Sequence, residues 1–195
     1  MKPPFPCEQI HTGLSRLNTV LDRFPVKSLV LAEACPLSRS EAVLRLLVDA
    51  RADVGARRGD RATALHLAAA FDRAAAIETL VGLGADKEAV KSYGMTPLHQ
   101  AALNGHVSVI KALVGLGADK EGVDRDGWTP LHFAASIHHV GAIQALVALG
   151  ASLEAKDSND DTPLDIARNC STTRKQEAVA ALERLCGAPS DGARE

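Results

Sequence analysis

A 33-residue period runs through the chain. A block that reads Thr-Ala-Leu-His-Leu-Ala-Ala in its first copy returns as Thr-Pro-Leu-His-x-Ala-Ala in the next two copies. The copies begin at Thr63, Thr96, Thr129 and Thr162. A second block, Gly-Ala-Asp-Lys-Glu, keeps the same period at Gly84 and Gly117, and a variant of it begins at Gly150. Two motifs that share one period predict a stack of equivalent supersecondary units.

Within one copy, the residues predict two helices followed by a hairpin loop. Thr96 is suited to be a helix N-cap, and Pro97 stands at the first helical position, where its missing N–H costs nothing. Asn104-Gly105-His106 breaks this helix, and apolar residues at helical spacing predict a second one after it. Gly117 ends the second helix in a left-handed conformation, and residues 118–127 form an extended hairpin loop.

This unit resembles the ankyrin repeat in its Thr-Pro-Leu-His-x-Ala-Ala box, its Asn-Gly-His turn and its Gly-Ala-Asp box. The resemblance covers residues 28–186 and implies an all-α solenoid of helix–turn–helix–hairpin loop units stacked side by side. The expected units are 28–57, 58–90, 91–123, 124–156 and 157–186, of which the first is degenerate and the last is a cap. Because one unit cannot bury its own core, each must pack on its neighbours.

The two ends of the chain depart from the repeat. Leu14, Leu17, Leu21 and Phe24 follow helical spacing, which predicts a short capping helix within an N-terminal segment 1–27. In the last unit Asp165 replaces the histidine, the turn over residues 169–173 is longer, and a charged second helix is expected near residues 176–185. Residues 187–195 are expected to be a flexible tail.

Composition argues against several classes of partner. The formal net charge is −2 and the sequence pI is about 6.4, so no basic field favours nucleic acid or an anionic membrane surface. No apolar run approaches the roughly 20 residues that cross a bilayer. The start of the chain lacks the apolar stretch of a signal peptide, and its four cysteines are widely spaced. We therefore expect free thiols and an intracellular protein, either cytoplasmic or nuclear.

The repeated histidines, His66, His99 and His132, are not expected to bind a metal. Equivalent residues of stacked units lie about 10 Å apart, whereas each zinc ligand must lie about 2.1 Å from one ion. The resemblance implies instead that each histidine joins adjacent loops by hydrogen bonds. No phosphate-binding or nucleophile motif occurs in the chain, so we expect no catalytic residue and no cofactor.

A partner protein is expected on the concave face. In the resembled family, this face is built by residues just before and after the Thr-Pro-Leu-His box. Carried onto this chain, the candidate partner-binding residues are Phe71, Tyr93, Met95, Leu103, Asn104, Arg125, Asp126, Trp128, Ser136 and Ile137. They include three of the six aromatic residues of the chain, and Trp, Tyr and Arg are common binding hot spots. The alternating charges of Asp86-Lys87-Glu88 and Asp119-Lys120-Glu121 are expected to be solvated loop tips.

Trp128 admits two interpretations. It follows a turn glycine and precedes an N-cap, which favours a recognition residue whose replacement by alanine would weaken partner binding with little loss of stability. Alternatively, it is a surface side chain that covers the loop of its neighbour.

The sequence therefore predicts a monomeric, non-catalytic protein-binding module. One alternative is a targeting or substrate-receptor subunit of a larger complex, docked through segment 1–27. Another is an enzyme subunit whose site has no recognisable motif.

Overall fold

A computed structural model describes residues 53–169 and 175–187 of the chain. The capping helix expected within segment 1–27 and nearly all of the degenerate unit 28–57 lie outside these ranges, as does the expected tail after Gly187. The described residues fold into an all-α stack, as the sequence predicts.

Each unit contributes two antiparallel helices. The first helices are α4 (Ala64–Ala70), α6 (Pro97–Asn104), α8 (Pro130–Ser136) and α10 (Pro163–Asn169). The second helices are α5 (Ala74–Gly82), α7 (Val107–Gly115), α9 (Val140–Ala148) and α11 (Lys175–Gly187). A short 3-10 turn, η1 (Ser92–Gly94), lies in the hairpin loop before α6. The α11 helix includes Gly187, the first residue of the range expected for the tail.

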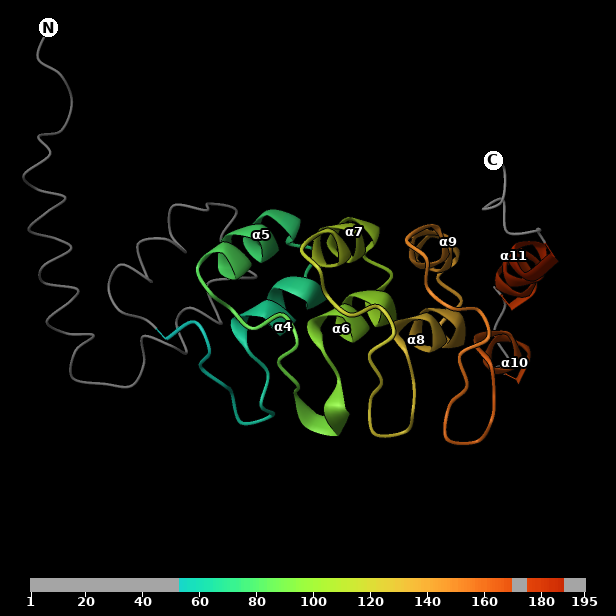
Figure 1. Cartoon of the computed structure of the whole chain (residues 1–195), viewed down its shortest axis with the longest axis horizontal. Helices are drawn as coiled ribbons and strands as arrows, with labels where there is room; N and C mark the ends of the chain where they lie inside the picture. The colour runs from blue at the N-terminus through green and yellow to red at the C-terminus, as the bar shows by residue number, and fades with distance from the viewer. Residues whose placement is uncertain (1–52, 170–174, 188–195) are drawn as a thin grey trace, which may run out of the picture.

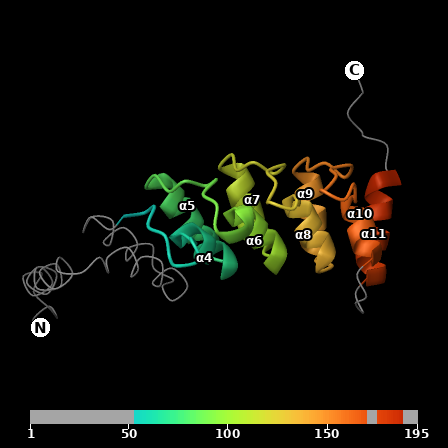
Figure 2. The ribbon, with the colours of Figure 1, turned by 90° about the horizontal axis from the view of Figure 1, so that it is seen from below.

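The helices form two parallel rows along the long axis of the stack (Figure 1). In one row α4, α6, α8 and α10 pack in chain order, and in the other α5, α7, α9 and α11 do the same. Figure 2 shows the same order from below. Among residues 53–169 and 175–187, none of the helices is long and apolar enough to cross a bilayer.

The core runs without interruption through the stack, because each unit repeats the same buried positions. First helices contribute Leu65, Leu98 and Leu131, and second helices contribute Ile77, Ile110 and Ile143, all at most 1% exposed. Alanine pairs such as Ala101 and Ala102 are fully buried between neighbouring first helices. Their small side chains let the backbones approach closely, which is why the Ala-Ala pair recurs in the repeat.

The hairpin loops end in four tips, which we number in chain order. Tip 1 spans residues 57–62 and tip 2 spans residues 90–95, while tip 3 spans residues 123–128 and tip 4 spans residues 156–161. Each is closed by one equivalent backbone bond, for example from the Asp124 N–H to the Trp128 carbonyl at 3.0 Å. The hairpin loops expected from the sequence are thus present, and none of their described residues forms a β-strand.

Left-handed backbone recurs with the same period as the sequence motifs. Gly117, just past α7, has a φ of 79°, as the sequence predicts. Within the tips the recurring position is Arg61, Gly94, Gly127 and Asp160, with φ between 65° and 81°. Gly127 is required for two reasons. Its φ is positive, and a Cβ at this position would lie 2.8 Å from the backbone nitrogen of Ser158 in the next tip.

Candidate functional site

Buried Thr–His pairs begin the first helices and join each unit to the next. In the second full unit, Nδ1 of His99 accepts hydrogen bonds from the Thr96 N–H at 3.2 Å and from the Thr96 hydroxyl at 2.8 Å. The other ring nitrogen, Nε2, therefore carries the proton and donates to the Trp128 carbonyl at 3.0 Å. His66 and His132 repeat the arrangement with the carbonyls of Met95 and Asp161. The expected loop-joining role of these histidines is thus confirmed.

These histidines are neutral in the folded protein. Burial lowers the pKa of His66 to about 4, although its bond to the Met95 carbonyl acts in the opposite direction. Burial also lowers the pKa of His99 and of His132. Both ring nitrogens of each residue already have partners within the stack, so the row of histidines is a structural feature.

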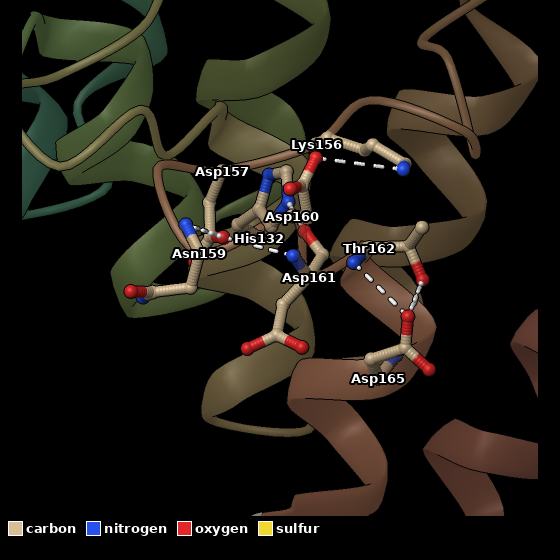
Figure 3. Close-up of polar contacts among 8 residues, drawn as sticks. All are labelled: His132, Lys156, Asp157, Asn159, Asp160, Asp161, Thr162 and Asp165. Carbon is tan, nitrogen blue, oxygen red and sulfur yellow. Dashed lines mark hydrogen bonds and ion pairs between the residues drawn. The ribbon is translucent and has the colours of Figure 1, made fainter.

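The last unit shows why its box departs from the pattern. Asp165 stands where the histidine would be, and its Oδ2 accepts hydrogen bonds from the Thr162 hydroxyl at 2.6 Å and the Thr162 N–H at 3.1 Å (Figure 3). A carboxylate can therefore replace the cap inside the unit, but it cannot donate a hydrogen bond to a carbonyl of a following unit. This unit therefore lacks the histidine bond by which each of the three preceding units joins its neighbour.

Backbone hydrogen bonds also join the four tips to one another. The Asp60 carbonyl accepts from the Ser92 N–H at 3.1 Å, and the Tyr93 carbonyl accepts from the Arg125 N–H at 3.1 Å. Tip 4 is joined in the same way, because the Ser158 N–H donates to a carbonyl of tip 3 at 3.0 Å. The tips thus form one continuous row along the lower edge of the stack in Figure 1.

The predicted partner-binding residues divide into two groups by exposure. The exposed residues are Phe71, Tyr93, Arg125, Asp126 and Ile137. The half-buried residues are Met95, Leu103, Asn104, Trp128 and Ser136. The largest exposed apolar side chains among them are Tyr93 at 68%, Phe71 at 52% and Ile137 at 48%. The structure thus leaves an aromatic residue accessible at tip 2 and two apolar residues accessible at the ends of first helices.

Phe71 and Ile137 occupy equivalent positions at the carboxyl ends of α4 and α8. Asn104 holds the same position in the unit between them, and its side-chain amide donates to the Ala70 carbonyl at 3.1 Å. His106 contacts the same carbonyl through Nε2 at 3.0 Å. The backbone beside Phe71 is therefore held in place by the following unit.

Trp128 is half-buried, and its side chain contacts the neighbouring unit. The indole N–H donates to Oδ2 of Asp157 in tip 4 at 3.0 Å. Its ring packs edge-on against Phe133, with a centroid separation of 5.1 Å, and lies 6.2 Å from His132. These contacts fit the interpretation in which Trp128 covers the loop of its neighbour. They predict that its replacement lowers stability, contrary to the first interpretation from the sequence.

Two features of the loops were missed from the sequence. Val90 and Val123 hold equivalent positions in successive units and are exposed, at 38% and 57%. Their shared position in the repeat was the signal that could have identified them. The carboxylate residues of the two Asp-Lys-Glu runs are exposed, as expected. The sequence did not predict that Glu88 also accepts a hydrogen bond from the Asp119 N–H at 2.9 Å, or that Glu121 repeats this contact one unit later.

Tip 4 is rich in carboxylates, but its geometry is that of a turn. Both Asn159 and Asp161 donate their backbone N–H groups to Oδ1 of Asp157, at 2.7 and 3.0 Å. Burial opposes ionisation of Asp157, but these N–H groups and the Trp128 indole outweigh it and lower its pKa. The side chains of Asn159 and Asp161 point in different directions (Figure 3). Across residues 53–169 and 175–187, no three His, Cys, Asp or Glu side chains are grouped to hold a metal ion.

Comparison with known protein families agrees with this geometry. A model described as ankyrin repeats in three copies matches residues 31–124, and one described as ankyrin repeats in many copies matches residues 120–167. These two matches identify repeats and no catalytic domain. A comparison with curated proteins gave no match.

Proposed function

The chain belongs to the ankyrin repeat family, and from this premise we propose that it is a non-catalytic module that binds a partner protein on its concave face. Repeats of this family are generally protein-binding modules. The concave face comprises the tips and the exposed side of the first helices. The observation that carries the proposal is the exposure of Phe71, Tyr93 and Ile137 on this hydrogen-bonded framework.

The framework supports the proposal because it is ordered before a partner arrives. Adjacent tips are joined by backbone bonds such as that from Arg125 to Tyr93, and adjacent units are joined by the buried histidines. Association therefore does not need to order these loops, which removes a large entropic cost of binding.

The chemistry of the face also supports a protein ligand. Phe71 and Ile137 are large apolar side chains, and each is about half exposed. Such residues add to binding when a partner removes them from water, by roughly 25 cal/mol per Å² of apolar surface. Between them, Asn104 donates its amide to the Ala70 carbonyl of the preceding unit.

A double variant tests the proposal. Phe71→Ser with Ile137→Ser removes the two large apolar side chains exposed at the ends of first helices, and both positions are exposed, so the stack should remain folded. The matched control is Glu78→Ser with Gln144→Ser, which changes two exposed residues on second helices of the same two units. The wild type, the concave-face variant and the control are each purified separately from cells. The proteins that co-purify with each are quantified by mass spectrometry.

We expect a set of proteins that accompanies the wild type and the control but is depleted with the concave-face variant. Circular dichroism should show equal helicity for all three. If the concave-face variant retains every protein that the wild type retains, the concave face is not the binding surface.

A further inference from the structure

The four tips carry net charges that change sign along the stack. Tip 1 has a net charge of +2, tip 2 of +1, tip 3 of −1 and tip 4 of −2. The charged residues are Arg57, Arg58, Asp60 and Arg61 in tip 1, Lys91 in tip 2, Asp124, Arg125 and Asp126 in tip 3, and Lys156, Asp157, Asp160 and Asp161 in tip 4. The series is antisymmetric about the midpoint between tips 2 and 3.

Single repeat positions show the same reversal. The second residue of each tip is Arg58, Lys91, Asp124 and Asp157, in order along the stack. The fifth residue is Arg61 in tip 1 and Asp160 in tip 4, with glycine in the two tips between them. The charges therefore occupy equivalent positions of the repeat. At these positions they are positive in tips 1 and 2 and negative in tips 3 and 4.

The row of tips is accessible and wide enough to be an interface. Within the four tips, every residue except Ala62 and Asp157 is at least partly exposed. A protein–protein interface of standard size uses about 20 to 30 residues on each side, and the four tips together fall within that range. The bonds between tips keep the charges in fixed order.

We propose that the row of tips is a self-association surface, on which a second copy of this chain binds in antiparallel orientation. A two-fold axis through the midpoint of the row places tip 1 of one copy opposite tip 4 of its partner, and tip 2 opposite tip 3. Every facing pair then has opposite net charge. An interface between identical chains related by a two-fold axis must be self-complementary, and the antisymmetric charge series meets that requirement.

Because salt screens charges over short distances, the order of the tips determines which alignment of the two chains is favoured. Neighbouring tips are about 10 Å apart, by the spacing of stacked elements, and the Debye length is about 8 Å at physiological ionic strength. Each tip therefore interacts mainly with the tip it faces. Sliding or reversing the second copy places like charges opposite each other, so the charges favour one alignment of the two chains.

The centre of the row adds an aromatic contact. Tyr93 in tip 2 is the most exposed of the large hydrophobic residues that the structure describes, at 68%, and it lies next to the midpoint. In the antiparallel arrangement tip 2 faces tip 3 of the partner, which carries Arg125. A guanidinium can stack on a tyrosine ring, so this pair contributes to association beyond net charge.

The monomer expected from the sequence is thus replaced by a monomer–dimer equilibrium. A dimer that buries the tips would compete with a partner on the concave face, but it does not depend on such a partner. The two proposals therefore fail separately. The double variant at Phe71 and Ile137 leaves every tip residue unchanged.

Two charge-reversal variants of the full chain test the dimer. The first is Arg58→Asp with Arg61→Asp, and the second is Asp160→Arg with Asp161→Arg. A matched control, Lys111→Asp with Arg184→Asp, makes the same change in net charge as the first variant, at exposed residues of α7 and α11. Association is measured by sedimentation velocity over protein concentrations of about 1 to 200 µM, the range of a weak interface.

We expect the wild type and the control to dimerise. Each reversal variant alone should dimerise at least about tenfold more weakly, because exposed charge pairs worth up to about fivefold each become repulsive at both ends of the dimer. An equimolar mixture of the two variants should dimerise again, because every facing pair regains opposite charge. Raising NaCl from about 0.1 M to about 1 M shortens the Debye length from about 10 Å to about 3 Å and should dissociate the wild type. A wild type that stays monomeric, or a mixture that associates no better than its components, overturns the proposal.

Discussion

Lowering the pH from 7 to 5 should destabilise the stack through its buried histidines. His66 is 1% exposed, and burial lowers its pKa to about 4, against 6.5 in the unfolded chain. The unfolded state therefore binds a proton first as the pH falls. The stability that neutral His66 contributes is complete above pH 6.5 and is lost as the pH falls toward 4.

The size of this effect follows from the two pKa values. For a pKa of about 4 in the folded state and 6.5 in the unfolded state, the free energy of unfolding falls by about 2 kcal/mol at pH 5. Burial also lowers the pKa of His99 and His132, so their contributions have the same sign. Hydrogen bonds lower the pKa of Asp165 below its usual 3.8, so its contribution is lost only at lower pH.

Urea denaturation followed by far-UV circular dichroism at pH 7, 6 and 5 measures this effect. The variant His66→Gln removes one titrating group, and it should lose less stability than the wild type between pH 7 and 5, by about 2 kcal/mol. Two results would show that His66 does not destabilise the stack at low pH: a wild type whose free energy of unfolding is unchanged between pH 7 and 5, or an equal loss in the His66→Gln variant.

Two further predictions concern contacts between tips 3 and 4. Trp128→Ala should lower the free energy of unfolding by about 2–4 kcal/mol, because it removes ring packing and the donor to Asp157. Trp128→Phe keeps a ring but not the N–H donor and should lose about half as much in urea titrations. Equal losses in the two variants would show that ring packing contributes nothing, and no loss in Trp128→Phe would show the same of the indole hydrogen bond. Gly127→Ala should cost at least about 2 kcal/mol, because its Cβ would lie 2.8 Å from the Ser158 nitrogen. Gly84→Ala, with a similar positive φ but open space, should cost about 1 kcal/mol, and thermal denaturation of both variants would check the difference.

The sequence predicted the features that depend on neighbours in the chain. Thr96 and Pro97 are adjacent in the chain, so these two residue types were enough to predict how α6 begins. The end of α7 was equally local, because Gly117 supplies the left-handed backbone just after it. The repeat period then predicted that each unit would show the same pattern.

Contacts between units could not be predicted in the same way. Trp128 lies 29 residues from Asp157, and only the packed stack brings the indole beside that carboxylate. The same is true of Glu88, whose partner Asp119 belongs to the next loop. A carboxylate that only faces solvent and one that binds the next loop cannot be distinguished in the sequence. The partner is a backbone N–H group, which nearly every residue has.

The charge series along the tips was present in the sequence but had no meaning until the tips were aligned. Arg58 and Asp157 are three units apart, and the chain as a whole has a net charge of only −2. Backbone bonds such as that between Ser158 and Asp126 show that the tips stand in one row. Only in this row do the charges of the four tips form an ordered series on one surface.

Both proposed binding surfaces depend on one continuous row of hydrogen-bonded tips. Residue-resolved amide hydrogen exchange by NMR measures this directly at Ser92, Arg125 and Ser158, whose N–H groups bond the preceding tip. We predict that these three amides exchange as slowly as amides in the middle of α6 and α8, although they lie at exposed loop tips. Exchange at the rate of unprotected loop amides would show that the tips move independently and do not form one continuous row.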